Sequence, residues 1–222
     1  TTSLSKVYRT DTVETTALNA VDISIAQGDF VAIMGPSGCG KSTLLKVLAG
    51  IIQQYQGLVQ IDGSAINPST QKIGFIPQNY GLLPWKNVVE NIRLAAKIKN
   101  TSSRGKEALD PLLQLLGLQG LEKRYPRELS GGQQQRVAIA RTLMMDPQVL
   151  LFDEPTAALD PEITKEVAEI IRTLSQTGIT QVVVTHEVEF ARKVASQVIY
   201  LEKGRIIESG TAAIFQSPQT SR

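Results

Sequence analysis

Residues 35–42 read Gly35-Pro36-Ser37-Gly38-Cys39-Gly40-Lys41-Ser42 and match the pattern G-x-x-x-x-G-K-[ST]. An apolar run, Phe30–Met34, precedes them, and a stretch with a helical pattern from Lys41 to Ala49 follows. A buried strand, a glycine-rich turn and a helix in that order form the context in which this pattern binds phosphate. A chance glycine-rich turn is the alternative, and the flanking strand and helix argue against it.

The residue types of this loop indicate its chemistry. Glycines let backbone N–H groups close around a phosphate, and the helix that starts at Lys41 adds the positive end of its dipole. Lys41 supplies a mobile charge for the outer phosphates, and Ser42 supplies a hydroxyl for Mg²⁺. We expect all eight residues and the adjacent Thr43 to contact a bound nucleotide. Alone, the motif indicates a nucleoside triphosphate and not what is done with it.

Short apolar runs alternate with helical patterns along the whole chain, which predicts an α/β fold with a mainly parallel sheet. Further strands are expected at 58–61, 73–76, 149–152, 181–184, 197–201 and 205–208, and further helices at 88–98, 107–116, 130–144 and 161–174. The chain before Phe30 and the part after Gln197 indicate some antiparallel strands. We interpret residues 81–145 as a helical lobe inserted into a single domain that spans 1–222.

Two acidic residues, Asp153 and Glu154, directly follow the apolar run Val149–Phe152. An acid at the end of a strand beside a phosphate loop can hold Mg²⁺, which fits Asp153. Glu154, one residue further, can polarise a water for attack on the γ-phosphate. Two solvated acids at the start of a loop are the alternative, and the phosphate loop makes the metal and base roles the better interpretation.

A second anion-binding pattern, Leu129-Ser130-Gly131-Gly132-Gln133, lies at the start of the helix expected at 130–144. Ser130 is a good N-cap, and the glycines after it expose backbone N–H groups. One domain rarely needs two such sites for one nucleotide. If the second site serves a nucleotide held by another copy, the protein dimerises head to tail.

With these motifs, the chain resembles the nucleotide-binding subunit of ATP-binding-cassette (ABC) transporters over essentially its whole length. Besides the motifs above, the resemblance rests on Gln78 in Ile76-Pro77-Gln78, on Ala158-Leu159-Asp160, on His186 after the strand at 181–184, and on Tyr8. The family often has serine where Ala158 stands. The resemblance implies a P-loop NTPase core with an antiparallel β subdomain and an inserted helical lobe.

The resemblance also implies a role for each residue. Lys41 and Ser42 are expected to hold ATP and Mg²⁺, Gln78 to sense the metal and the attacking water, Glu154 to act as base, and His186 to contact the γ-phosphate. It further implies that Asp160 organises the contact with the second copy and that Tyr8 stacks on adenine, although a tyrosine at this position can equally pack in the core. An incidental histidine is the alternative for His186.

The implied activity is ATP hydrolysis that powers transport. Two copies, or a pair of cassettes, close on ATP and drive integral membrane permease subunits, with a substrate-binding protein as a further partner. Two alternatives stay open: a soluble ABC ATPase that acts on ribosomes or DNA, and the energiser of a lipoprotein- or macrolide-type exporter. Parts of the chain are similar to nitrate, sulfonate and taurine importers, and 185–210 is similar to polar amino-acid importers.

The composition is consistent with this class. Lys and Arg number 23 against 21 Asp and Glu, for a net charge of +2, which is too balanced for binding nucleic acid through a broad basic surface. The sequence has no run of about 18 apolar residues, so it predicts no membrane span. The resemblance further implies a peripheral protein, held at the cytoplasmic face of the membrane by its permease.

Two single residues carry hypotheses of their own. Cys39, the only cysteine, lies near a helix N-terminus and Lys41, both of which favour a thiolate; alkylation would then block ATP binding, and ATP would protect. The alternative is a small residue that fits a tight loop. Trp85, the only tryptophan, either forms part of a groove for the membrane subunit or fills the core of the helical lobe.

Overall fold

A six-stranded sheet forms the centre of the molecule. The computed structural model describes residues 1–10, 12–98, 108–157 and 159–211. The strand order is β11-β10-β3-β9-β8-β7, and all neighbours are parallel except β10 and β11. The strands are β3 (Phe30–Met34), β7 (Ile73–Ile76), β8 (Val149–Asp153), β9 (Thr180–Val184), β10 (Gln197–Glu202) and β11 (Arg205–Gly210). The predicted α/β architecture with a mainly parallel sheet is confirmed.

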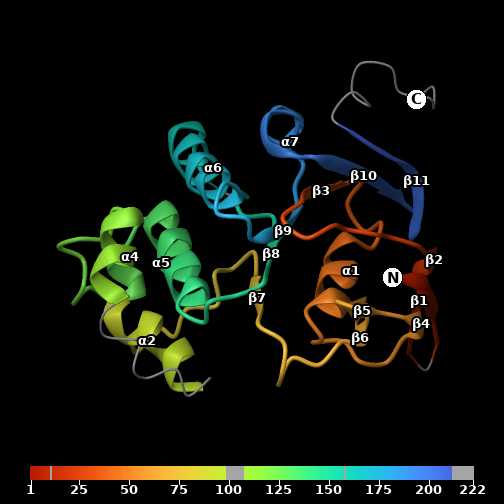
Figure 1. Ribbon diagram of the computed structural model, residues 1–222, viewed down its shortest axis with the longest axis horizontal. Coiled ribbons are helices and arrows are strands. Elements are labelled where there is room, and N and C mark those ends of the chain that lie inside the picture. Colours follow the sequence, from red (N-terminus) through yellow and green to blue (C-terminus); the bar gives the residue numbers. More distant parts are fainter. Residues whose placement is uncertain (11, 99–107, 158, 212–222) are drawn as a thin grey trace.

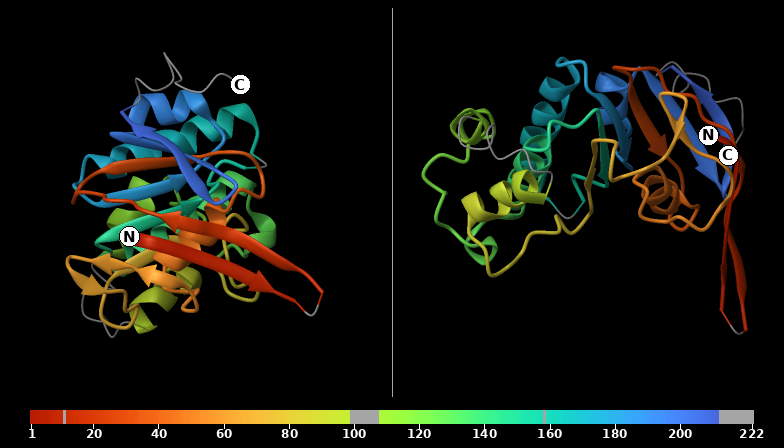
Figure 2. Two further views of the ribbon diagram at one scale, coloured as in Figure 1. Left: turned by 90° about the vertical axis from the view of Figure 1, so that its right-hand side faces the viewer. Right: turned by 60° about the horizontal axis from the view of Figure 1, so that its bottom comes forward.

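A second, antiparallel sheet has the order β2-β1-β4 and consists of β1 (Thr2–Arg9), β2 (Glu14–Val21) and β4 (Gln56–Leu58). The β1–β2 hairpin projects from the body as a long ribbon (Figure 2). The single strand predicted at 58–61 is wrong. The chain leaves this sheet at Val59 and forms a separate hairpin of β5 (Gln60–Ile61) and β6 (Ser64–Ala65), because Asp62 and Gly63 both adopt the positive φ of a tight turn.

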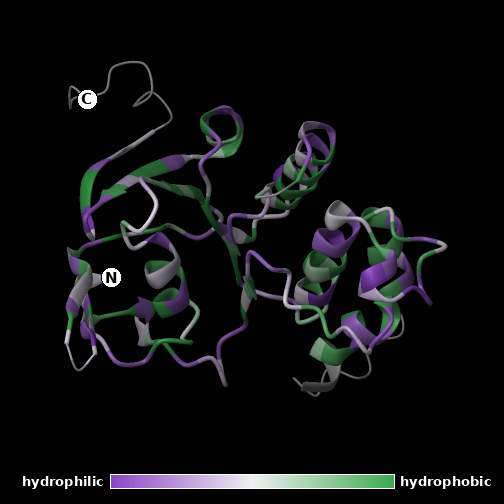
Figure 3. Ribbon diagram, turned by 180° about the vertical axis from the view of Figure 1, so that it is seen from behind, coloured by the Kyte–Doolittle hydropathy of each residue, from purple (hydrophilic) through white to green (hydrophobic). Residues whose placement is uncertain are grey.

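Helices cover both faces of the central sheet (Figure 1). Successive side chains of a strand point to opposite faces, so Leu151 and Val184 pack against α1 (Lys41–Leu48). Phe152 and Val183 point the other way and share a core with α5 (Gly131–Leu143) and α6 (Pro161–Ser175). Each such buried side chain contributes about 1.5–3 kcal/mol. The helices themselves alternate between hydrophobic and hydrophilic residues (Figure 3), as helices with one buried face do.

A group of helices lies beyond β7 and β8, at one end of the molecule (Figure 1). Its members are α2 (Val88–Ile98), α4 (Leu109–Leu115), the short 3-10 helix η1 (Pro126–Glu128) and α5 (Gly131–Leu143). α6 (Pro161–Ser175) and α7 (Val188–Val194) complete the described helices. The sequence prediction missed α7, which is a short helix without a side-chain cap. Glu107, the expected start of α4, lies outside the described residues.

The sheet register brings the functional segments to one edge. Ile33 of β3 lies opposite Val184 of β9, and Phe152 of β8 lies opposite Val183. Ile76 of β7 in turn lies opposite Phe152. The residues that follow these parallel strands therefore share the carboxyl edge of the sheet, where open α/β sheets bind ligands. None of the helices in the described ranges is both long and apolar enough to span a membrane.

Candidate nucleotide site

The loop of residues 35–40 connects β3 to α1 and packs closely against the backbone of neighbouring segments. Gly35 has φ +146°, and a Cβ there would lie 1.9 Å from the carbonyl oxygen of Leu201. Gly40 has φ +110°, and its Cβ would lie 2.2 Å from the carbonyl oxygen of Ala17. Both positions therefore require glycine. The tip of the loop, residues 36–38, is exposed.

Lys41 is buried at the start of α1, with only 5% of its surface exposed. Its ammonium donates to the carbonyls of Gly35 and Pro36 at 2.8 and 2.9 Å, and it lies 4.0 Å from Cys39 Sγ. Sulfur is a weak acceptor, so one of the three donors of the ammonium is poorly used. The loop thus holds one positive charge directly behind its exposed tip.

Ser42 and Asp153 come together as the sequence predicts, from α1 and the end of β8. Ser42 Oγ donates to Asp153 Oδ1 at 2.8 Å. Asp153 is 6% exposed, and burial raises the pKa of its carboxyl, whereas the hydrogen bond from Ser42 opposes that shift. A hydroxyl and a carboxylate at this spacing are the hard oxygen donors that Mg²⁺ prefers beside substrate phosphates.

Glu154 and His186 also meet, which the sequence did not predict. His186 Nε2 lies 2.9 Å from Glu154 Oε1. The backbone of Glu154 has φ +49°, which costs a non-glycine residue about 1–3 kcal/mol. Its N–H donates to the carbonyl of Val184 at 3.0 Å, which ties β8 to β9 at this point.

Gln78 and Tyr8, two further predicted site residues, both have exposed side chains. Gln78 is exposed, two residues beyond the end of β7. Tyr8 is 42% exposed, so it does not pack in the core. Its hydroxyl lies 3.5 Å from Thr43 Oγ1 in the first turn of α1, and Lys6 Nζ lies 5.0 Å from its ring centroid. An aromatic ring thus stands beside the helix that follows the phosphate loop.

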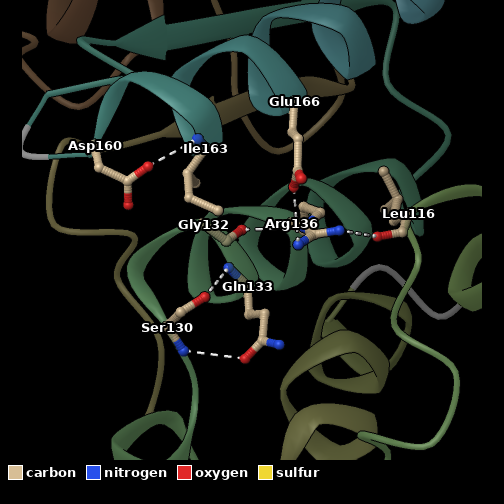
Figure 4. A network of polar contacts seen from close by, with 8 residues as sticks. All are labelled: Leu116, Ser130, Gly132, Gln133, Arg136, Asp160, Ile163 and Glu166. Atoms are coloured by element: carbon tan, nitrogen blue, oxygen red, sulfur yellow. Dashed lines mark hydrogen bonds and ion pairs between the residues drawn. The ribbon is translucent and has the colours of Figure 1, made fainter.

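The N-terminus of α5 is closed by a capping box (Figure 4). Ser130 caps the helix: its Oγ accepts from the N–H of Gln133 at 3.3 Å, and Gln133 Oε1 accepts from the N–H of Ser130 at 3.0 Å. The two glycines between them permit close packing on α6. A Cβ on Gly132 would lie 2.1 Å from Ile163 Cγ2, and one on Gly131 would lie 2.9 Å from Leu159 Cδ2.

Asp160 is the N-cap of α6, whose first turn packs on the start of α5 (Figure 4). Its Oδ1 accepts from the N–H of Ile163 at 3.0 Å, and Ile163 is the residue that packs on Gly132. Further along, Arg136 of α5 lies 3.5 Å from Glu166 of α6. The segments around Ser130 and Asp160 are therefore packed as neighbours. Ala158, where the family often has serine, lies outside the described residues.

The expectation of a reactive Cys39 thiolate is wrong. Cys39 is 5% exposed, and burial raises the pKa of its thiol more than the nearby Lys41 lowers it. The sequence shows the charge and the helix end, which favour the thiolate, but not the burial that outweighs them. The side chain also fits against Gly35, whose Cβ would lie 2.9 Å from Cys39 Sγ. Cys39 is a small residue in a tight loop.

A raised thiol pKa predicts slow alkylation with a late pH dependence. We expect iodoacetamide to modify Cys39 more slowly than free cysteine at pH 8, because the thiolate is the reacting form and little of it is present below the raised pKa. The rate should still be rising at pH 9 and above. Intact-mass measurement of the labelled fraction over time gives the rate at each pH. Labelling at pH 7 that is faster than that of N-acetylcysteine would contradict this account.

Trp85 is 69% exposed, so the interpretation that it fills the core of the helices is wrong. The loop that carries Trp85 is hydrogen-bonded to the side chain of Asn91, which is fully buried. Asn91 Nδ2 donates to the carbonyls of Leu83 and Lys86 at 3.1 and 2.8 Å, and its Oδ1 accepts from the N–H of Leu83 at 2.8 Å. An exposed aromatic on a fixed loop has the character of a contact residue.

Comparison with known proteins identifies the class. The model of the ABC transporter family matches residues 18–157. The arginine transport ATP-binding protein ArtP of Haemophilus influenzae is 47% identical over 91% of this chain and 89% of its own length. The L-cystine transport system ATP-binding protein TcyN of Escherichia coli K12 is 44% identical over 93% and 89%. The dimeric cassette MJ0796, solved in a post-hydrolysis state with ADP and Pi, is 34% identical, with a TM-score of 0.84 over 95% of this chain and 97% of that one.

The chain therefore belongs to the ABC transporter family. It is the ATP-binding and ATP-hydrolysing cassette of a transporter, and cassettes of this family dimerise on ATP and power transport through a membrane permease.

Proposed function

We propose that this cassette energises the import of a polar amino acid. The supporting observation is that ArtP and TcyN, whose names assign them to arginine and L-cystine transport, match it at 47% and 44% identity over almost the whole chain. A substrate-binding protein that delivers the amino acid belongs to the proposal. So does a place at the cytoplasmic face of the membrane, where a permease holds the cassette.

In the proposed site, one copy binds the phosphates of ATP. The backbone N–H groups of residues 35–40 surround the phosphates, and Lys41 turns its poorly used donor to an outer phosphate oxygen. Tyr8, exposed beside Thr43, offers its ring face to the adenine. Ser42 and Asp153 would hold Mg²⁺, whose charge neutralises the phosphate oxygens when it is bound. Their two oxygens, 2.8 Å apart, fit such an ion without rearrangement of the fold.

Glu154 is the proposed general base. It follows Asp153 at the carboxyl edge of the sheet, and one of its carboxylate oxygens lies 2.9 Å from His186 Nε2. The second carboxylate oxygen then accepts a proton from a water in line with the γ-phosphate. We propose that Gln78, which follows the neighbouring strand β7, orients that water, and that His186 contacts the γ-phosphate.

The second copy completes the site in this proposal. The capped N-terminus of α5, with Ser130, Gly131, Gly132 and Gln133, presents its dipole and N–H groups to the γ-phosphate held by the first copy. Asp160, packed beside it through Ile163, lies at the same interface. Loss of the γ-phosphate removes the bridge between the copies. Trp85 and its rigid loop are proposed to contact the permease.

Purification and transport together test the proposal. We expect the tagged chain, purified from its native cells in mild detergent, to carry a permease in about equal amount. Reconstituted into vesicles that enclose Mg·ATP, with any binding protein recovered, the complex should accumulate labelled arginine or cystine and not labelled glucose. The complex with Glu154→Gln is the matched control and should accumulate none.

Two outcomes would contradict the proposal. Recovery with ribosomes or nucleic-acid enzymes and without a permease would place the cassette among the soluble ABC ATPases. A permease that moves cargo out of cells, or that leaves every polar amino acid outside the vesicles, would overturn amino-acid import and leave the ATPase assignment intact.

A further inference from the structure

Arg141, a residue that no motif singles out, fastens the loop after Gln78 to α5. Its Nη1 donates to the carbonyl of Gly81 at 2.6 Å, and its Nη2 donates to the carbonyl of Tyr80 at 2.9 Å. A guanidinium that donates twice from a planar fork fixes the direction of both acceptors. The contact joins residues about 60 positions apart in the sequence.

The backbone that receives this fork has an unusual conformation. Tyr80 has φ +62° and Gly81 has φ +60°, so two successive residues are left-handed, and the first of them is not glycine. Such a conformation is disfavoured for a tyrosine and persists where surrounding contacts impose it. With both residues in this conformation, their two carbonyls accept from the same side chain.

The Tyr80 side chain reaches α5 a second time, near the start of the helix. A Cβ on Gly131 would lie 3.3 Å from the Tyr80 hydroxyl, so the phenol lies against the first turn of α5. Gly131 and Arg141 are separated by about 15 Å of helix axis. The loop is therefore held to α5 at both ends of the helix.

We propose that Arg141 is a positioning residue, which with Tyr80 makes the loop after Gln78 and α5 move as one body. The start of α5 then takes its place against the partner's nucleotide only when this loop is in place. Because the loop runs from the nucleotide edge at Gln78 toward Trp85, the clamp links the permease-facing side to the dimer interface. The inference rests on the proposed function, which assigns the start of α5 to the nucleotide of the second copy.

The test separates ATP binding from dimer closure in chains that carry Glu154→Gln. Arg141→Met keeps the length and the apolar stem of the side chain and removes the fork. We expect the affinity of the monomer for a fluorescent ATP analogue to stay within about twofold, because the phosphate loop is untouched, and the dimer dissociation constant to rise about tenfold or more. Arg141→Lys, which keeps the charge without the fork, should restore part of the loss.

Arg172→Met is the matched control. Arg172 is an exposed arginine that pairs with Glu169 at 2.8 Å within α6, and its loss should change neither constant. Equal dimer dissociation constants for Arg141→Met and its parent would overturn the proposal. The proposal would also be overturned if Arg141→Met weakened binding of the ATP analogue to the monomer as much as it weakened the dimer. That result would indicate a general structural role for Arg141.

Gly81→Ala keeps the proposal testable if Arg141→Met loses the circular dichroism of its parent. Alanine disfavours φ +60°, so it disturbs the acceptor end of the clamp without removing a side chain. We again expect weaker dimers and unchanged ATP binding, and a dimer dissociation constant equal to that of the parent would contradict the role of Arg141. A parent chain that stays monomeric with Mg·ATP would count against the proposed function itself, which distinguishes the two failures.

Discussion

Replacing Glu154 by glutamine is expected to lower kcat for ATP hydrolysis by about 100- to 10,000-fold. An amide cannot accept the proton of the attacking water, whereas it keeps the size of the carboxylate and its place beside His186 Nε2, which lies 2.9 Å from Glu154 Oε1 in the parent. The nucleotide-binding residues of the loop are unchanged, so ATP affinity should be retained. Phosphate release at saturating Mg·ATP measures the effect.

Glu162→Gln is the matched control for this substitution. Glu162 is an exposed acid in the first turn of α6, and its replacement should leave kcat within about twofold. If Glu154→Gln kept more than about a tenth of the parent's kcat, proton transfer to Glu154 would not be a main contribution to the reaction.

Replacing Lys41 by methionine is expected to weaken ATP binding by about 10- to 150-fold. The ammonium already donates to Gly35 and Pro36, and a phosphate oxygen in place of the weak contact to Cys39 Sγ completes its three donors. A hydrogen bond to a charged group contributes about 1.5–3 kcal/mol, which is the stated range of affinity. Calorimetric titration with ATP in the Glu154→Gln background measures the dissociation constant.

Lys46→Met distinguishes this contact from a general loss of charge. Lys46 is an exposed lysine in the last turn of the same helix, α1, and its loss should change ATP affinity by less than about threefold. Equal effects at Lys41 and Lys46 would show that the net charge of the helix, and not the buried ammonium, attracts the phosphates. A thermal melt of each variant confirms that the fold is retained.

The sequence predicted the elements whose signals are local. β3, β7 and α2 have the predicted bounds, because apolar runs and the phosphate-loop pattern mark them within a few residues. The break between β4 and β5 was missed, although Asp62-Gly63 is a hairpin signal that could have revealed it. The cap at Ser130 was predicted from its residue type and is present.

The contacts that were not predicted connect distant parts of the chain. The pairing of Glu154 with His186 depends on the register of β8 against β9, which no short-range pattern encodes. The contact of Arg141 with the loop at 80–81 likewise depends on how α5 packs. The pKa of Cys39 was predicted in the wrong direction because burial is a property of the folded chain.

In the proposed cycle, two copies of the chain close around ATP, each contacting the nucleotide bound by the other. Sedimentation of the Glu154→Gln chain, with and without Mg·ATP, tests it most directly. We predict a monomer without nucleotide, a dimer with saturating Mg·ATP, and loss of that dimer when Lys41→Met is added. A Glu154→Gln chain that binds Mg·ATP and remains monomeric at every protein concentration would contradict the account.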